Sequence, residues 1–266
     1  MDFALLFITG LGAGTLGSLI GVGGGFIVVP VLLLLFAYPH TWTVATSLFF
    51  IFINSLVSSY NYSRQKRVDF ATGIPFAVST IPGALAGAYL VPYLSGKAFD
   101  TAFAVLLLLV SLFMLFRPQG PARDRTPDWL GKKTTRKFTD AHGVEHEYSF
   151  SLLFGIMVSF FVGFLSSIFG IGGGIIHVPA MTLIMGIPPH IATATSMFIL
   201  TVSSFFGTLP HIPAGEVQPV AALALALGAI GGAQIGTRLA PKVNARRLMQ
   251  IFAVIMFMLA LRLFLR

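Results

Sequence analysis

The sequence lacks cysteine and has few charged residues. Without cysteine, the chain forms no disulfide and no iron–sulfur or cysteine-ligated zinc site, and thiol redox chemistry is excluded. Charged residues make up only 10% of the chain, whereas a soluble domain carries about a quarter. Hydrophobic residues make up 56%, and the mean hydropathy is +0.88. These values place the chain among integral membrane proteins, with the lipid bilayer as its surroundings.

Acidic residues are scarcer than basic ones, with 9 Asp and Glu against 17 Lys and Arg. A basic excess can indicate a nucleic-acid partner. Here nearly all the basic residues lie between or at the ends of apolar runs, as membrane topology requires, so we expect no nucleic acid. No His and carboxylate cluster has metal-ligand spacing, and no nucleophile stands beside a base. We therefore expect no enzyme, no catalytic residue, no metal and no cofactor.

A glycine-rich stretch is present twice, as GVGGGFIVVP at 21–30 and GIGGGIIHVP at 170–179, with seven of ten positions identical. The same offset of 149 relates Ala-Thr-Ser at 45–47 to Ala-Thr-Ser at 194–196. One register maintained through separate blocks indicates an internal duplication.

The duplication divides the chain into a first membrane repeat at 1–116, a charged linker at 117–149 and a second membrane repeat at 150–266. Each repeat has about four apolar segments of spanning length, one of them broken or re-entrant at the glycine motif. The predicted fold is therefore an all-α integral membrane protein with two pseudo-symmetric repeats. The linker is expected to be an exposed, partly disordered loop.

Each glycine motif should break a helix, because it places four glycines and a proline in ten residues. In lipid, such a break survives only where it is buried in protein or lines a polar cavity. Two corresponding breaks in two halves are typical of the substrate site of a secondary transporter. Helix packing is the alternative use of glycine, and it explains the pairs Gly83/Gly87 and Gly232/Gly236 best.

An unwound loop that opens onto a half-helix offers unpaired N–H groups and the positive end of the helix dipole. It can bind an anion without a buried cation, and Lys and Arg are absent from the span centres. Neighbouring hydroxyl and amide groups could add donors, although interhelical hydrogen bonding is the better explanation for any single hydroxyl. The candidate substrate-binding residues are Gly21, Gly23, Gly24, Gly25, Thr46, Ser47, Asn54, Gly170, Gly172, Gly173, Gly174, Thr195, Ser196 and Ser203.

His177 lies in the second motif where the first has Val28. A histidine titrates near neutral pH, which suits proton coupling, so His177 is the proton-coupling candidate. A neutral, hydrogen-bonded structural histidine is the alternative interpretation.

The distribution of basic residues bears on topology. If each glycine segment crosses the membrane once, the halves are parallel and the loops divide the basic residues twelve against five. If each glycine segment enters and returns, the halves are inverted and the division is fourteen against three. The positive-inside rule favours the sharper division, and hence inverted halves with a cytoplasmic linker and both termini outside.

The doubled G-x-G-G-G-x-x-x-V-P motif, the Ala-Thr-Ser that follows it and the Gly-Ala-x-x-Gly spans resemble the TauE/SafE family, often called sulfite exporters. The resemblance covers both halves, and the linker is longer and more charged than the family pattern. It implies a multi-pass permease for small organosulfur or oxyanionic compounds such as sulfite, sulfoacetate or related sulfonates. The motif positions carried over are Gly21, Gly23, Gly24, Gly25, Pro30, Gly170, Gly172, Gly173, Gly174 and Pro179.

We therefore expect a permease of the bacterial inner membrane that moves a small anion by alternating access. The alternative is a non-transporting membrane subunit whose glycine motifs serve helix packing with a partner. A homodimer is compatible with the sequence.

Overall fold

The computed structural model describes residues 3–94, 96–115, 124–127, 129, 133–139, 143–243 and 245–264. Most of these residues are helical, as the sequence analysis predicts. In the first half, the helices are α1 (Phe3–Ile20), α2 (Gly25–Leu34), α3 (His40–Arg64), α4 (Phe70–Leu90), a 3₁₀ turn (Val91–Tyr93) and α5 (Gly96–Leu115). In the second half they are α6 (Leu152–Phe169), α7 (Gly174–Pro179), a π-helical turn (Ala180–Ile184), α8 (Pro189–Thr208), a 3₁₀ turn (Leu209–His211), α9 (Pro219–Leu239) and α10 (Ala245–Phe264).

Six helices among the described residues are long and apolar enough to cross a membrane. They are α1, α3, α4, α6, α8 and α9. The segments that follow the two glycine motifs, Gly25–Leu34 and Gly174–Ile184, are shorter apolar helices. The protein is thus a multi-pass membrane protein in which two apolar helices are too short to span alone.

Small residues bring two pairs of long helices into close contact. A methyl group added at Gly83 or Gly87 of α4 would collide with the backbone of α6, at Phe160 and Phe164. Gly232 and Gly236 of α9 stand in the same way against the backbone of α1. The prediction that these glycines serve helix packing is confirmed.

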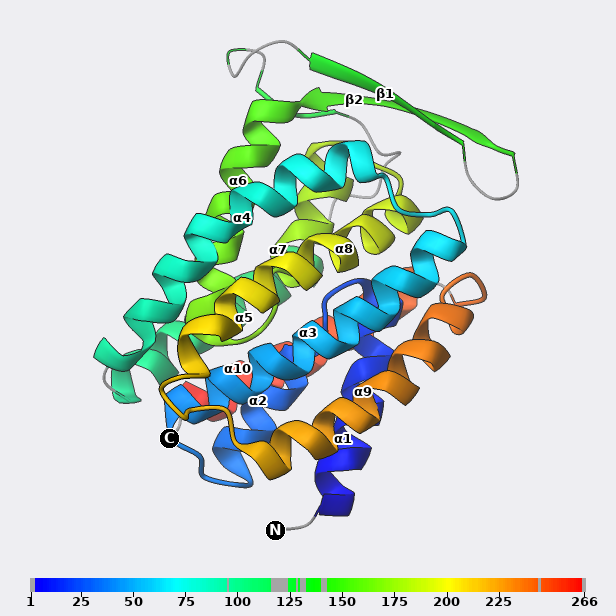
Figure 1. The fold of residues 1–266 in the computed structure, drawn as a ribbon. Coiled ribbons are helices and arrows are strands. Elements are labelled where there is room, and N and C mark those ends of the chain that lie inside the picture. The colour runs from blue at the N-terminus through cyan, green and yellow to red at the C-terminus, as the bar shows by residue number, and fades with distance from the viewer. Residues whose placement is uncertain are drawn as a thin grey trace.

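α3 packs on α8 and α5 packs on α10, and in the view of Figure 1 the second pair lies behind the first. In the view of Figure 1, α1 rises from the lower end and α2 turns back toward it, while α6 descends from the upper end and α7 turns back upward. α1 begins and α10 ends at the lower end. The two glycine motifs therefore connect helices that reverse direction inside the bundle.

The second short helix is irregular at its proline. Pro179 has no N–H to donate, and the helix continues as a π-helical turn in which Met185 N donates to Ala180 O at 3.1 Å. π-helical turns of this kind occur often at functional sites.

Part of the predicted linker forms an antiparallel β-hairpin of β1 (Lys133–Thr139) and β2 (Glu145–Ser151), at the upper end of Figure 1. The expectation of a loop is wrong for these residues. Their side chains alternate between more and less exposed positions, which is the pattern of a strand that covers a surface. Of the rest of the predicted linker, the structure describes only 124–127, 129 and 143–144, and the expected disorder otherwise falls outside the described residues.

The hairpin is attached to the start of α4 by a buried polar contact. Tyr148 Oη donates to Asp69 Oδ2 at 2.6 Å, and Asp69 Oδ1 also accepts from the N–H groups of Ala71 and Thr72 at the helix start. Burial, followed by the hydrogen bond to Asp69, raises the pKa of Tyr148, so the phenol keeps its proton. The linker thereby becomes an ordered part of the fold.

Candidate functional site

The two glycine motifs adopt a backbone that only glycine accepts readily. The φ angles are 84° at Gly21, 90° at Gly23 and 90° at Gly24 in the first motif, and 64° at Gly170 and 73° at Gly172 in the second. A side chain at these positions would strain the backbone. The prediction of two unwound segments within apolar sequence is confirmed, and we call them the first break (21–24) and the second break (170–173).

The two breaks lie against one another, although 149 residues separate them in sequence. A methyl group on Gly25 would lie 2.5 Å from the carbonyl oxygen of Gly170. One on Gly174 would collide with the carbonyl oxygen of Gly21. The glycines therefore serve two purposes at once, since they permit the left-handed turns and allow the two backbones to touch.

Serine hydroxyls from α3 and α8 hold the carbonyl groups of the breaks. Ser47 Oγ donates to Gly170 O at 2.6 Å, and Ser196 Oγ donates to Gly21 O at 2.9 Å. Each serine thus reaches across to the break of the other half. Ser47 and Ser196 are placed at the breaks, as the sequence interpretation expected.

The N–H groups of the breaks are not held in the same way. Across the described residues, no hydrogen bond is made by the N–H groups of Gly24 and Gly25, or by those of Gly172, Gly173 and Gly174. All five residues are buried. A buried N–H without a partner is rare and costs about 1–3 kcal/mol, so this cluster is where a ligand with acceptor atoms would be stabilised.

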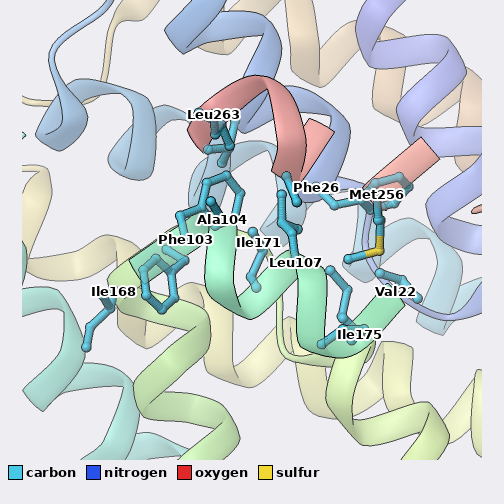
Figure 2. Close-up of a cluster of buried hydrophobic side chains, with 14 of the residues drawn as sticks. Val22, Phe26, Phe103, Ala104, Leu107, Ile168, Ile171, Ile175, Met256 and Leu263 are labelled. Carbon is cyan, nitrogen blue, oxygen red and sulfur yellow. The ribbon is translucent and has the colours of Figure 1, made fainter. Parts of the chain in front are cut away.

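One side of the breaks is apolar. The residues of the breaks that are not glycine, Val22 and Ile171, join a hydrophobic cluster with Phe103 and Leu107 of α5 and Met256 of α10 (Figure 2). Glycine backbone and serine hydroxyls occupy the side toward α3 and α8. The breaks therefore have one dry side and one side that carries hydrogen-bonding groups.

Asn54 belongs to the first break. Its Nδ2 donates to Gly23 O at 2.9 Å, and its Oδ1 accepts from Ser18 Oγ at 3.2 Å. Ser203, the corresponding residue of α8, is equally buried, and its hydroxyl has no partner in the described structure.

Thr46 and Thr195 lie elsewhere than the breaks. Thr46 Oγ1 accepts from Gln218 N at 3.1 Å, just before α9, and Thr195 Oγ1 accepts from Asp69 N at 3.0 Å, just before α4. Adjacent residues of a helix point about 100° apart, so a threonine and the serine after it cannot both face the break. These contacts place the two threonines at helix starts, and we do not include them in the site.

His177 is fully buried near the second break. Its Nε2 is 2.8 Å from Ser159 Oγ, and its ring stacks on that of Phe76 with a centroid distance of 6.5 Å and an interplanar angle of 3°. Nδ1 has no partner among the described residues. The proton-coupling role of His177 stays a prediction.

Sequence reasoning did not select three serines near the breaks: Ser18, Ser166 and Ser167. Ser18 bonds both Asn54 and Ser58, and the hydroxyls of Ser166 and Ser167 are buried without a partner in the described structure. The signal was available, because Ser18 and Ser167 are related by the offset of 149 and each stands three residues before its break.

Two helix breaks that contact each other inside a multi-pass helical bundle are typical of a membrane protein of the transporter class. The family model described as "Sulfite exporter TauE/SafE" matches residues 6–263, and the chain belongs to that family. The resemblance seen in the motifs is thus confirmed.

Curated relatives bear the same kind of name. The chain is 35% identical to "Probable membrane transporter protein YunE" of Bacillus subtilis, over 99% of this chain and 97% of the relative. It is 28% identical to "Probable membrane transporter protein MJ0441" of Methanocaldococcus jannaschii, over 92% and 88%, and 25% identical to "Probable membrane transporter protein YfcA" of Escherichia coli, over 88% and 79%. No solved structure matches the chain. Family and relatives together indicate a membrane transporter.

Proposed function

We propose that this transporter carries a small oxyanion, such as sulfite, sulfoacetate or a related sulfonate, bound where the two breaks meet. One observation supports this above others: the carbonyl groups of Gly21 and Gly170 are occupied by serine hydroxyls, while neighbouring N–H groups have no partner. Such a site offers free donors, while two of its carbonyl acceptors are already taken. An acceptor-rich anion matches it, whereas a cation or an ammonium group does not.

The anion is held without a buried cationic side chain. Among the residues at the breaks, the donors are backbone N–H groups and hydroxyls, and the short helix α2 begins at the first break with its positive dipole end. Zwitterions such as taurine would bring an ammonium group that finds few free acceptors there. We therefore expect sulfite and short sulfonates to compete for one site, and taurine to compete poorly.

We infer that the halves are inverted repeats that rock against each other in alternating access. The offset of 149 relates α1 to α6 and α4 to α9. The close pair α1/α9 of the structure therefore corresponds to the close pair α6/α4. The pairs α3/α8 and α5/α10 each join equivalent helices. This exchange is expected of any two-fold axis, and the opposite directions of α1 and α6 in Figure 1 favour an axis in the membrane plane.

The orientation follows from the basic residues. We place the protein in the bacterial plasma membrane with the hairpin end in the cytoplasm, because that end also holds the α3–α4 and α9–α10 loops (Figure 1). Together with the linker, these loops account for fourteen of the seventeen basic residues.

The competing function is a membrane subunit without transport activity. It is favoured by the close approach of motif glycines, since Gly25 and Gly174 contact the opposite break. Packing alone does not account for buried N–H groups that have no partner.

Purified protein in liposomes separates the two functions. We expect saturable flux of radiolabelled sulfite that sulfoacetate inhibits and taurine leaves nearly unchanged, measured against liposomes without protein. Co-purification of a specific partner without any flux would support the subunit. Saturable uptake of an organic cation with no competition from anions would contradict the choice of substrate.

A further inference from the structure

In the first half, a closed set of hydrogen bonds fills the space between α1, α3 and the first break. Ser18 Oγ lies 2.6 Å from Ser58 Oγ and donates to Asn54 Oδ1 at 3.2 Å. Asn54 Nδ2 in turn donates to Gly23 O at 2.9 Å. We call Ser18, Asn54 and Ser58 the first-half brace. It is fully buried, and every polar side chain in it has a partner.

The corresponding positions of the second half are Ser167, Ser203 and Gly207, by the same offset of 149. The amide side chain of Asn54 corresponds to the shorter hydroxymethyl group of Ser203, and Ser58 corresponds to Gly207, which has no side chain. Ser167 is 0% exposed and Ser203 is 2% exposed, and neither hydroxyl has a hydrogen-bond partner in the described structure. The network that closes the first half is therefore absent here.

Ser203 and Ser167 lie beside the second break. Ser196, Leu200, Ser203 and Gly207 follow one another at helical spacing along one face of α8. A methyl group on Gly172 would lie 3.2 Å from Leu200 Cδ2, and one on Gly207 would lie 2.5 Å from Ser167 Oγ. Ser203 stands between these two contacts and faces the same side.

Ser166 adds a third unpartnered hydroxyl. It replaces Gly17 of the first half, where an added methyl group would collide with the backbone N of Gly24. Ser166 O accepts from Gly170 N at 2.8 Å, so the residue is one turn from the second break. Its side chain is 1% exposed, and Ser166 Oγ has no partner in the described part of the chain.

We propose that the anion is bound by the second half, by the hydroxyls of Ser166, Ser167 and Ser203 together with the N–H groups of the second break, while the first-half brace is structural. This assignment rests on the proposed function. Buried hydroxyls without partners are unusual in native proteins and call for a specific explanation. Three of them beside free N–H groups make a cluster of donors, which an oxyanion satisfies with its several acceptor atoms.

The test is to rebuild the brace in the second half. The double variant Ser203→Asn/Gly207→Ser restores the side chains that Asn54 and Ser58 provide in the first half. By analogy with the first half, we expect its new amide to donate to Gly172 O and to accept from Ser167, whose hydroxyl must turn away from the Cβ added at 207, 2.5 Å away. The variant thus removes the Ser203 hydroxyl and gives the Ser167 hydroxyl a partner. We expect sulfite to bind more than about tenfold more weakly, by calorimetry on purified protein, with the melting temperature equal or higher.

Single variants keep the test independent of that double variant. Ser167→Ala removes an unpartnered hydroxyl, so binding should weaken about tenfold with no loss of melting temperature. Ser18→Ala breaks the first-half brace, so the melting temperature should fall while sulfite affinity changes less than twofold. A structural role for both serines would lower both melting temperatures alike.

Two outcomes overturn different claims. If the wild-type protein binds sulfite and the rebuilt variant or Ser167→Ala binds it equally well, the assignment to the second half is wrong and the anion function stands. If the wild-type protein binds neither sulfite nor sulfoacetate and transports neither, the proposed function is wrong, and the assignment that rests on it is wrong with it.

Discussion

The crossed hydrogen bonds from Ser47 and Ser196 give the most direct test of the site. Ser196→Ala leaves the carbonyl group of Gly21 buried and without its donor, because the hydroxyl at 2.9 Å is removed. An unsatisfied buried acceptor costs about 1–3 kcal/mol. Ser47→Ala does the same to Gly170 O at 2.6 Å, so the two variants should be destabilised to a similar extent.

Both substitutions should also weaken anion binding. A carbonyl group released from its serine directs negative charge toward the donors that hold the ligand. A loss of about 1–2 kcal/mol corresponds to a 5–30-fold weaker affinity. The assay is the melting temperature of the purified protein with and without sulfite, together with calorimetric sulfite affinity.

Ser204→Ala is the matched control on the same helix. Ser204 is buried, and its hydroxyl donates at 2.5 Å to Leu200 O, four residues earlier in α8. That carbonyl already takes part in the helix, so removal of the hydroxyl leaves no acceptor unsatisfied. If Ser196→Ala costs no more stability than Ser204→Ala and leaves sulfite affinity unchanged, the carbonyl groups of the breaks do not need their serines and the reasoning fails.

Three further predictions test orientation, glycine roles and coupling. Thr135→Cys, on the hairpin, should be protected from an impermeant maleimide in intact cells, whereas Tyr93→Cys at the opposite end should react; the reverse pattern would invert the assigned orientation. Gly173→Leu should abolish sulfite flux while the protein still inserts, because its φ of −63° accepts a side chain and the added methyl meets Val162. Gly87→Leu should instead lower expression and stability, because its Cβ meets the backbone of α6, and equal flux in both variants would refute the distinction. His177→Gln should retain binding but flatten the pH dependence of flux between about pH 5 and 8, and an unchanged profile would make His177 structural.

The breaks and the packing glycines could be predicted from sequence because both depend on local chemistry. Three consecutive glycines before a proline do not form a helix, whatever surrounds them. Gly83 and Gly87, four residues apart, form one smooth helical face, and the structure packs that face on α6. The offset of 149 then carried each inference to the other half.

The hairpin could not be predicted in the same way. Its strands are rich in charged residues, and their order depends on a tertiary contact, the hydrogen bond from Tyr148 to Asp69. Asp69 itself appears in sequence only as a capping residue before α4. The alternation of side-chain types in 133–139 could have predicted a strand. A two-stranded hairpin alone is only marginally stable, however, so the sequence offered little reason to expect one without a surface for it to cover.

Which hydroxyls face the breaks depends on helix geometry, and residue type alone does not predict it. Thr46 and Ser47 look equivalent as neighbours in sequence, yet they bond Gln218 and Gly170 on different sides of α3. The unequal partnering of Ser167 and Ser18 is harder still. It follows from differences on the helix that each serine faces, where Asn54 and Ser58 of α3 correspond to Ser203 and Gly207 of α8.

A site made of neutral donors also suits the transport cycle that we propose. A carrier returns empty in every cycle, and a buried cation without its anion would be costly in the low-dielectric interior of the membrane. The N–H groups of the breaks and the hydroxyls of Ser166, Ser167 and Ser203 carry no net charge. The empty site therefore costs the free energy of unsatisfied donors but not the larger cost of an unpaired buried charge. Binding then relieves unsatisfied donors instead of neutralising a charge. An anion held in this way can be released on the other side, which a tightly paired arginine would hinder.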